Sequence, residues 1–169
     1  MLKLLVLFYF YLLLSLPLAQ GNDCNWHLLP FYSPHLQYDT DEDWDIQISD
    51  REQSDIYIKA TINNRRLMFG VEAKNNAGKY SPNFRAAEQF RAVIAHLDGQ
   101  FDIILGTWYS GDNMSILNEF TAQGMSLEEA ASQTWTGKQA ASLGYEKVHV
   151  EYVSGTSGRY KEVIVGFKK

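Results

Sequence analysis

The sequence predicts one α+β domain with the element order ββαβαααββ. Apolar and polar residues alternate over 56–73, and again over Tyr145–Val153 and Arg159–Lys168, and both patterns predict a β-hairpin. Between them, an apolar pattern of helical period at 84–97 and a short apolar run at Phe101–Leu105 predict a helix and a buried strand. We expect a mixed or antiparallel sheet of the two hairpins and the central strand, packed against helices.

The chain opens with the pattern of a signal peptide at residues 1–21. Lys3 precedes an uncharged apolar run from Leu4 to Gln20, and Ala19 and Gly21 are small enough for cleavage after Gly21. The run is shorter than the roughly 18 to 20 apolar residues that a membrane-spanning helix needs, and an uncleaved anchor is the alternative. We therefore expect a secreted protein, extracellular or periplasmic, without stable membrane insertion after cleavage.

The rest of the chain is long enough for one domain with a sizeable core and too short for two. Residues 22–54 are expected to form an irregular aromatic and acidic arm, although Ile46 and Ile48 alternate with polar residues as in an edge strand. The globular α+β domain is expected at 55–169. Cys24 is the only cysteine, so no internal disulfide forms, and its thiol is either free or bridged to another molecule.

Acidic residues are concentrated in one segment. The formal net charge is −5, and eight acidic residues fall between Asp39 and Asp55. The residues after this segment are close to neutral, so they lack the broad basic surface of a tight nucleic-acid-binding protein, although a small basic cleft remains compatible with them. Charge alone therefore leaves both nucleic acid and a partner protein open as binding partners.

The first hairpin brings three charged residues together. A two-residue loop at 63–64 places Asp55 opposite Glu72, and a four-residue loop, the alternative, places Asp55 opposite Lys74. Glu72 and Lys74 are two residues apart and project from the same face of the strand. The loop length therefore decides which of the two residues Asp55 meets.

Four helices are expected between the hairpins. The first begins with a first-turn proline, Pro82, and ends at Asp98-Gly99. Gly124 and Gly144 end the second and the fourth. The expected N-caps are Ser81 for the first helix, Asp112 for the second, Ser126 in a capping box with Glu129 for the third, and Thr136 with Gln139 for the fourth.

The end of the first hairpin is also the first candidate site. Carboxylates of Asp55 and Glu72 side by side are candidate ligands for a hard divalent cation, Mg²⁺ or Mn²⁺. The ammonium of Lys74 beside them can orient or activate water. The alternative is an ion pair of Lys74 with Asp55 or Glu72 on a solvated sheet face.

This combination of residues resembles the nuclease fold known as PD-(D/E)XK, in which an acidic residue on one strand and E-x-K on the next are followed by a helix and another strand. Asp55, Glu72 and Lys74 match the acid and the E-x-K, and Gln89 on the next helix matches the supporting residue of some members. The resemblance covers Asp55 to Leu105. It implies a metal-dependent nuclease, with Asp55 and Glu72 as metal ligands and nucleic acid as the substrate.

The second half of the chain resembles another group. The motifs G-T-W and G-D-N after Leu105, T-W-T-G-K further on, and the closing G-R-Y-K-E-V-I-V-G-F-K-K are similar to uncharacterised C-terminal modules of secreted bacterial polymorphic-toxin proteins. The resemblance covers 106–169. It implies export and an effector role, and it supplies no catalytic residue.

Two further sets of residues are candidates for binding. The first lies at a strand-to-helix turn and at a helix start, where backbone N–H groups can receive an anion. It would serve a non-catalytic domain that recognises a ligand or a partner protein, and the alternative is that its tryptophans are core or rim residues. This surface consists of Trp108, Asp112, Asn113, Trp135, Thr136 and Lys138.

The second set is acidic. From Asp39 to Asp50, acids stand at positions one, three, five and twelve, as in a calcium-binding EF-hand loop. Trp44 occupies the position where the sharp turn of an EF-hand needs glycine. Casual Ca²⁺ binding by this arm and a merely solvated acidic arm are the two expectations.

Overall fold

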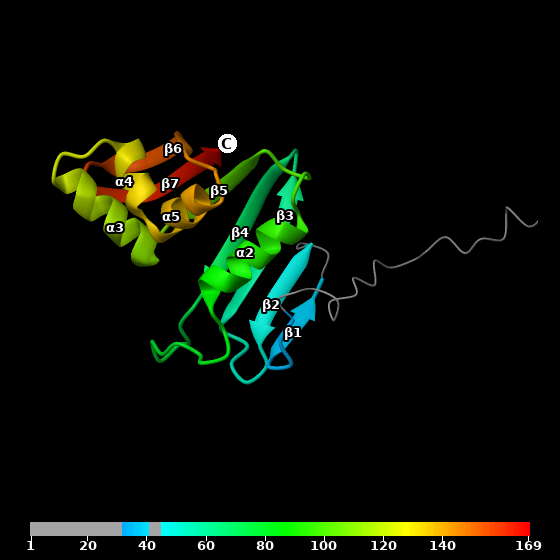
Figure 1. Ribbon diagram of the computed structural model, residues 1–169. Coiled ribbons are helices and arrows are strands. Elements are labelled where there is room, and N and C mark those ends of the chain that lie inside the picture. Colours follow the sequence, from blue (N-terminus) through cyan, green and yellow to red (C-terminus); the bar gives the residue numbers. More distant parts are fainter. Residues whose placement is uncertain (1–31, 41–44) are drawn as a thin grey trace, which may run out of the picture. The chain divides into compact units, whose positions relative to one another are not determined.

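The computed structural model describes residues 32–40 and 45–169, and in them seven strands form one mixed sheet that is accompanied by four helices (Figure 1). The strands are β1 (Leu36–Asp39), β2 (Ile46–Asp50), β3 (Tyr57–Asn63), β4 (Arg66–Glu72), β5 (Ile103–Trp108), β6 (Lys147–Thr156) and β7 (Arg159–Lys168). The helices are α2 (Ala86–His96), α3 (Gly111–Ala122), α4 (Leu127–Gln133) and α5 (Trp135–Ser142). The predicted α+β class is confirmed, with two strands added in front of the expected order.

The two added strands come from the segment that was expected to be an irregular arm. β1 and β2 pair with each other, and β2 also pairs with β3, so β1 is the edge of the sheet and β2 is an inner strand. Ile46 and Ile48 are buried because every second residue of β2 faces the core. The compact unit extends over Phe31–Lys169.

The predicted signal peptide and Cys24 lie outside the described residues. So do Trp44 and the middle of the acidic run. Among the described residues, no helix is both long enough and apolar enough to cross a membrane.

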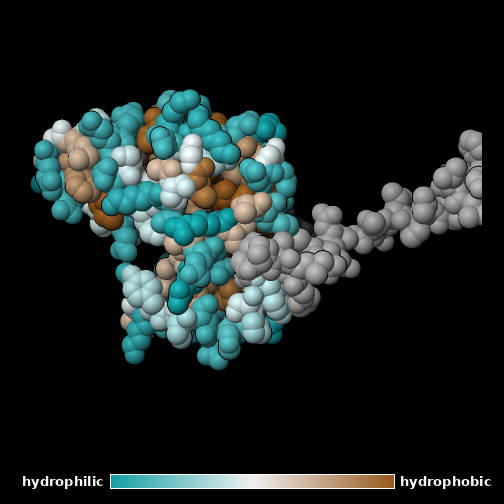
Figure 2. Space-filling model, in the orientation of Figure 1, coloured by the Kyte–Doolittle hydropathy of each residue, from teal (hydrophilic) through white to brown (hydrophobic). Residues whose placement is uncertain are grey.

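One face of the sheet carries the core. The core residues of β3, β5 and β7 are buried, and they alternate along each strand with residues that point to the other face of the sheet. Phe90 of α2 joins the helices to this face, because its ring lies 4.8 Å from that of Phe69 on β4 and 5.6 Å from that of Trp135 on α5. In Figure 2, hydrophobic residues gather near the middle of the viewed face, with hydrophilic residues around them.

The first hairpin has a different register from the expected one. Asn64 and Arg65 form its two-residue turn, both with positive φ (50° and 58°), as a type I′ turn requires. Tyr57 is therefore the partner of Glu72, and the expectation that Asp55 lies opposite Glu72 is wrong. The shift is two residues, so the apolar faces still match, and the continued register places Asp55 opposite Lys74, as in the alternative.

Three of the four expected N-caps are also placed elsewhere. α2 begins at Ala86 with Arg85 as its N-cap, whereas the Ser81 hydroxyl accepts from the N–H of Asn83 in a turn before the helix and donates to the buried carboxylate of Asp50. Ser110 is the N-cap of α3, and Thr134 is that of α5. Asp112 and Thr136 therefore lie inside the first turns of these two helices.

The capping box of α4 is confirmed. The backbone N–H of Glu129 donates to the Ser126 hydroxyl, and the Glu129 carboxylate accepts from the backbone N–H of Ser126. The Ser126 hydroxyl also donates to the Glu129 carboxylate (2.8 Å), and this bond, followed by the bond from the Ser126 N–H, holds the pKa of Glu129 below its usual value.

Candidate functional site

A cleft opens where two parallel strands separate. β4 and β5 pair only over Arg66–Met68 and Ile103–Leu105. Beyond these three pairs, β4 stays with β3 and β5 stays with β7, so their carboxyl ends diverge (Figure 1). A cleft of about 1030 Å³ lies between the diverging ends and the segments that follow them. Ligands of open α/β sheets bind at such carboxyl-end crevices.

Two of the predicted candidate sites meet in this cleft. Glu72 and Lys74 line it from the end of β4, while Trp108, Asp112 and Asn113 line it from the end of β5 and the start of α3. Trp135 and Thr136 of α5 line it as well. Asp55, Gln89 and Lys138 are not among its lining residues. The metal-site candidate and the tryptophan surface are thus largely one place.

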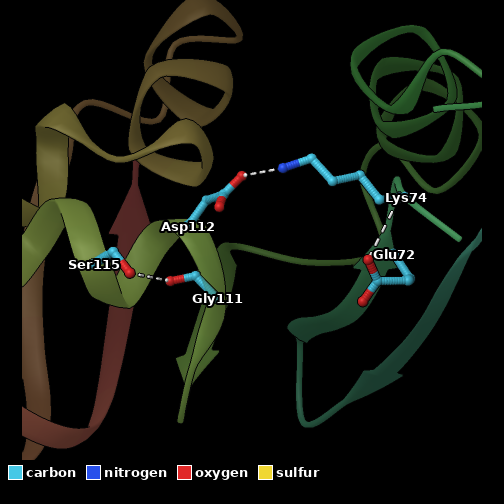
Figure 3. Close-up of polar contacts among 5 residues, drawn as sticks. All are labelled: Glu72, Lys74, Gly111, Asp112 and Ser115. Atoms are coloured by element: carbon cyan, nitrogen blue, oxygen red, sulfur yellow. Dashed lines mark hydrogen bonds and ion pairs between the residues drawn. The ribbon is translucent and has the colours of Figure 1, made fainter. Parts of the chain in front are cut away.

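Lys74 bridges the two sides of the cleft (Figure 3). Its Nζ lies 3.3 Å from Oδ2 of Asp112, at the start of α3. On its own side, the backbone N–H of Lys74 donates to Oε1 of Glu72 (3.4 Å), and Nζ lies 5.1 Å from the centre of the Tyr80 ring. The side chain of Lys74 therefore pairs with an acid from the opposite side of the cleft, and not with Asp55 or Glu72 as the ion-pair alternative expected.

The charge of Lys74 is stabilised by these contacts. A hydrogen bond to Tyr80, and next the hydrogen bond and charge of Asp112, raise the pKa of Lys74 above its ordinary value. Across the cleft, the Ser115 hydroxyl donates to the carbonyl of Gly111 (3.0 Å), inside the first turns of α3 that carry Asp112 (Figure 3). The Lys74 ammonium is thus paired with one carboxylate, that of Asp112, while the Glu72 carboxylate accepts from the backbone of Lys74.

We expect Asp112→Asn to lower the pKa of Lys74 toward its ordinary value. Two partners raise this pKa, Tyr80 and Asp112, and the substitution removes the charge of Asp112. A pKa raised by folding stabilises the folded state below the ordinary lysine pKa, and this contribution is lost as pH rises through the folded-state pKa. NMR titration of the Lys74 side chain measures the pKa. Asp98→Asn, which removes a different lysine's partner, is the control, and equal pKa values of Lys74 in both variants contradict the ion pair.

Asp55 lies at the same end of the sheet as Lys74. Its Oδ2 accepts the backbone N–H of Asn76 at 2.8 Å, which fixes Asp55 to the segment just after Lys74. Gln89 is on α2, is 5% exposed, and its Oε1 has no hydrogen-bond partner among the described residues. Buried polar atoms are normally paired, so Gln89 is unusual for a residue that only packs.

The side of the cleft formed by α3 and α5 is held rigidly. Nδ2 of Asn113 donates to the Thr136 hydroxyl (2.9 Å), and the Thr136 N–H donates to Oδ1 of Asn113 (3.4 Å). Because the Thr136 N–H donates to Asn113 and Thr136 is buried, this N–H is not presented to an anion in the cleft. Trp108 is 6% exposed and lies against Gly106, and Trp135 packs on Phe90. These tryptophans form the wall of the cleft, as the core-or-rim alternative expected.

Four other residues that line the cleft were not predicted as site residues. Tyr80 and Tyr109 are 66% and 63% exposed, and they line the cleft from opposite sides. Tyr57 and Arg85 line it too. In the sequence, Tyr80 and Tyr109 each follow the carboxyl end of a strand. This position indicates a shared site only once β4 and β5 are known to be parallel neighbours in the sheet.

The acids of the calcium candidate have other partners. Oδ2 of Asp45 accepts from the Thr61 hydroxyl (3.1 Å) and from the Ile62 N–H (2.8 Å). Asp50 is 1% exposed and accepts from the N–H of Glu52 at 2.7 Å. Asp41 and Asp43 lie outside the described residues. Among those that are described, no three or more His, Cys, Asp or Glu residues are grouped so as to hold a metal ion.

Comparison of the chain with protein-family models, with curated proteins and with solved structures finds no match.

Proposed function

We propose that the cleft is the active site of a secreted, toxin-like effector that cleaves nucleic acid with the help of a divalent metal ion. The observation that carries the proposal is the position of Glu72 and Lys74, which lie together at the carboxyl end of β4 in a cleft large enough for a substrate. The signal-peptide pattern at 1–21 supports action outside the cell that makes the protein.

The donor set suits Mg²⁺ or Mn²⁺. Mg²⁺ keeps several waters and is usually bound by one or two carboxylates together with substrate phosphates, so it does not need a cage of three protein ligands. Glu72 would hold the ion from the wall of the cleft. Asp55 does not line the cleft, but it lies at the same end of the sheet, with its Oδ2 accepting from the N–H of Asn76, and would be the second ligand. The metal would polarise a phosphoryl oxygen and lower the pKa of a bound water.

The other residues of the site have positioning roles in this proposal. Lys74 would place its charge beside the attacked phosphate. In the absence of substrate, its ammonium is held by Asp112 from the opposite side of the cleft and by Tyr80 from its own side. The unpaired Oε1 of Gln89 supports a role for this residue beyond packing. Because Gln89 does not line the cleft, that role would be to support a neighbour rather than to touch the substrate.

A second candidate is a secreted binding domain without chemistry. The exposed rings of Tyr80 and Tyr109 favour it, because large exposed side chains at a cleft are typical of recognition surfaces. A ligand or a partner protein would then occupy the same cleft without being changed.

Incubation of the purified protein with plasmid DNA and with RNA separates the two candidates. We expect cleavage in Mg²⁺ or Mn²⁺ and none in EDTA. Glu72→Ala and Lys74→Ala should each slow it by at least about 100-fold, since each removes a group that acts on the reacting phosphate.

Exposed residues away from the cleft provide matched controls. Glu119→Ala and Lys161→Ala remove an acid and a lysine that do not line it and should leave the rate unchanged. Intact DNA and RNA after incubation with a folded wild-type protein, with folding checked by circular dichroism, contradict the nuclease and leave the binding domain.

A further inference from the structure

We infer that the cleft accepts single-stranded nucleic acid in preference to a duplex. The inference names the substrate class of the site and therefore rests on the proposed nuclease function. It starts from Tyr80 and Tyr109, which are the most exposed of the large hydrophobic side chains among the described residues. Both line the cleft, one after β4 and one after β5.

The two rings are suited to stacking on bases. Tyr80 pairs with Lys74 in an isolated β-bridge and has the Lys74 ammonium 5.1 Å from its ring centre. Tyr109 lies between Trp108 at the end of β5 and the N-cap of α3. Proteins that bind single strands combine such rings with cations that follow the phosphates, and Lys74 and Arg85 are the cations lining this cleft.

Bases of a duplex cannot use these rings. In a double helix the bases stack on one another, and a protein ring reaches a base face only when the strand is unpaired or the base is flipped out at a cost in free energy. The volume of about 1030 Å³ is at the upper end of the range for small-molecule pockets. Such a cleft fits a few nucleotides of one strand.

Charge does not favour a duplex either. Tight nonspecific duplex binding comes from many Lys and Arg contacts to phosphates, with release of counterions. In this cleft the positive charges of Lys74 and Arg85 face the negative charges of Glu72 and Asp112, and the whole chain has a net charge of −5. Stacking must therefore supply the larger part of the affinity.

Fluorescence anisotropy with the full chain tests the inference. The probes are a fluorescein-labelled DNA oligonucleotide, its RNA equivalent and the matching DNA duplex, all in EDTA so that binding is measured without cleavage. We expect the single strands to bind about tenfold more tightly than the duplex, and Tyr109→Ala to weaken single-strand binding by about tenfold, the effect of losing one stacked base.

Tyr109 is the better probe because Tyr80→Ala also removes a partner of Lys74. Tyr109→Phe keeps the ring and should bind like the wild type. Tyr152→Ala removes a ring that is 48% exposed on β6, outside the cleft, and should also bind like the wild type.

The outcomes distinguish this inference from the nuclease proposal. Equal or tighter duplex binding, no effect of Tyr109→Ala beyond that of Tyr152→Ala, or no binding of any oligonucleotide overturns the single-strand inference; the last result favours a partner protein. Metal-dependent duplex cleavage that Tyr109→Ala leaves unchanged would overturn it while the nuclease stands. Tight single-strand binding without cleavage in Mg²⁺ or Mn²⁺ keeps the ligand class and removes the nuclease.

Discussion

Phe90→Ala is expected to reduce the free energy of unfolding by about 3–5 kcal/mol, the usual cost of truncating a buried phenylalanine. Phe90 is fully buried and its ring contacts Phe69 on β4 and Trp135 on α5. The substitution leaves a cavity at the point where a strand and two helices meet. The surrounding structure collapses into such a cavity only partly, so most of the lost contacts are not replaced. Urea unfolding followed by circular dichroism measures the change.

Two variants control this measurement. Tyr152→Ala removes a large aromatic side chain from an exposed position on β6 and should change stability by no more than about 0.5 kcal/mol. Phe90→Leu keeps most of the apolar volume and should fall between the wild type and Phe90→Ala. A loss below about 1 kcal/mol in Phe90→Ala would contradict the packing described for α2.

Gly137→Ala is expected to destabilise the protein even though Gly137 lies inside a helix. Alanine is favoured over glycine in helices by about 1 kcal/mol, so propensity alone predicts stabilisation. A Cβ at this position would clash with the backbone oxygen of Ala131 and lie 2.7 Å from that of Ser132. These oxygens belong to the backbone and cannot rotate away from the added Cβ as a side chain would. Overpacking of this kind costs about 1–3 kcal/mol. Two backbone oxygens are involved, so we expect an overpacking cost at the upper end of this range, which leaves a net loss of about 2 kcal/mol in urea unfolding.

Gly70→Ala is the matched control for this substitution. Gly70 is in the middle of β4, its φ is not positive, and an added Cβ would meet no atom within 4 Å. Because glycine weakens a strand interior, alanine should be neutral or stabilising there by up to about 1 kcal/mol. Stabilisation by both substitutions would contradict the close approach of α4 and α5.

Local patterns were enough to predict the second hairpin and the presence of the helices before it. The capping box of Ser126 and Glu129, for example, depends only on residues three positions apart. Ser81 shows why the start of α2 could not be predicted in the same way. Its hydroxyl accepts from the N–H of Asn83 and donates to Asp50, a residue far away in the sequence, so Ser81 closes a turn before the helix and does not cap it.

The hairpin register could not be decided by hydrophobic pattern. A shift of two residues leaves every apolar side chain on the same face, and the turn at Asn64-Arg65 has no glycine to mark it. The two strands of the predicted arm were obscured for another reason. Leu36, Ile46 and Ile48 are buried, but they stand beside a run of acids that is typical of a solvated loop.

The candidate site was predictable only in parts. Glu72 and Lys74 stood out because they are neighbours on one strand, and Trp108 and Asp112 because they follow another. Nothing in their spacing indicates that Lys74 and Asp112 form an ion pair. That contact exists because β4 and β5 are parallel neighbours that separate after three pairs, which is a property of the whole sheet.

The short pairing of β4 with β5 leaves the two parts of the sheet, β1–β4 and β5–β7, joined by few backbone hydrogen bonds. Seven residue pairs join β3 to β4 and six join β5 to β7, but only three join the two parts of the sheet. Side-chain packing adds a second connection, because Phe90 of α2 contacts Phe69 of β4 and Trp135 of α5. A molecule bound to both sides of the cleft would add a third connection, so ligand binding should make the join between the two parts of the sheet more rigid.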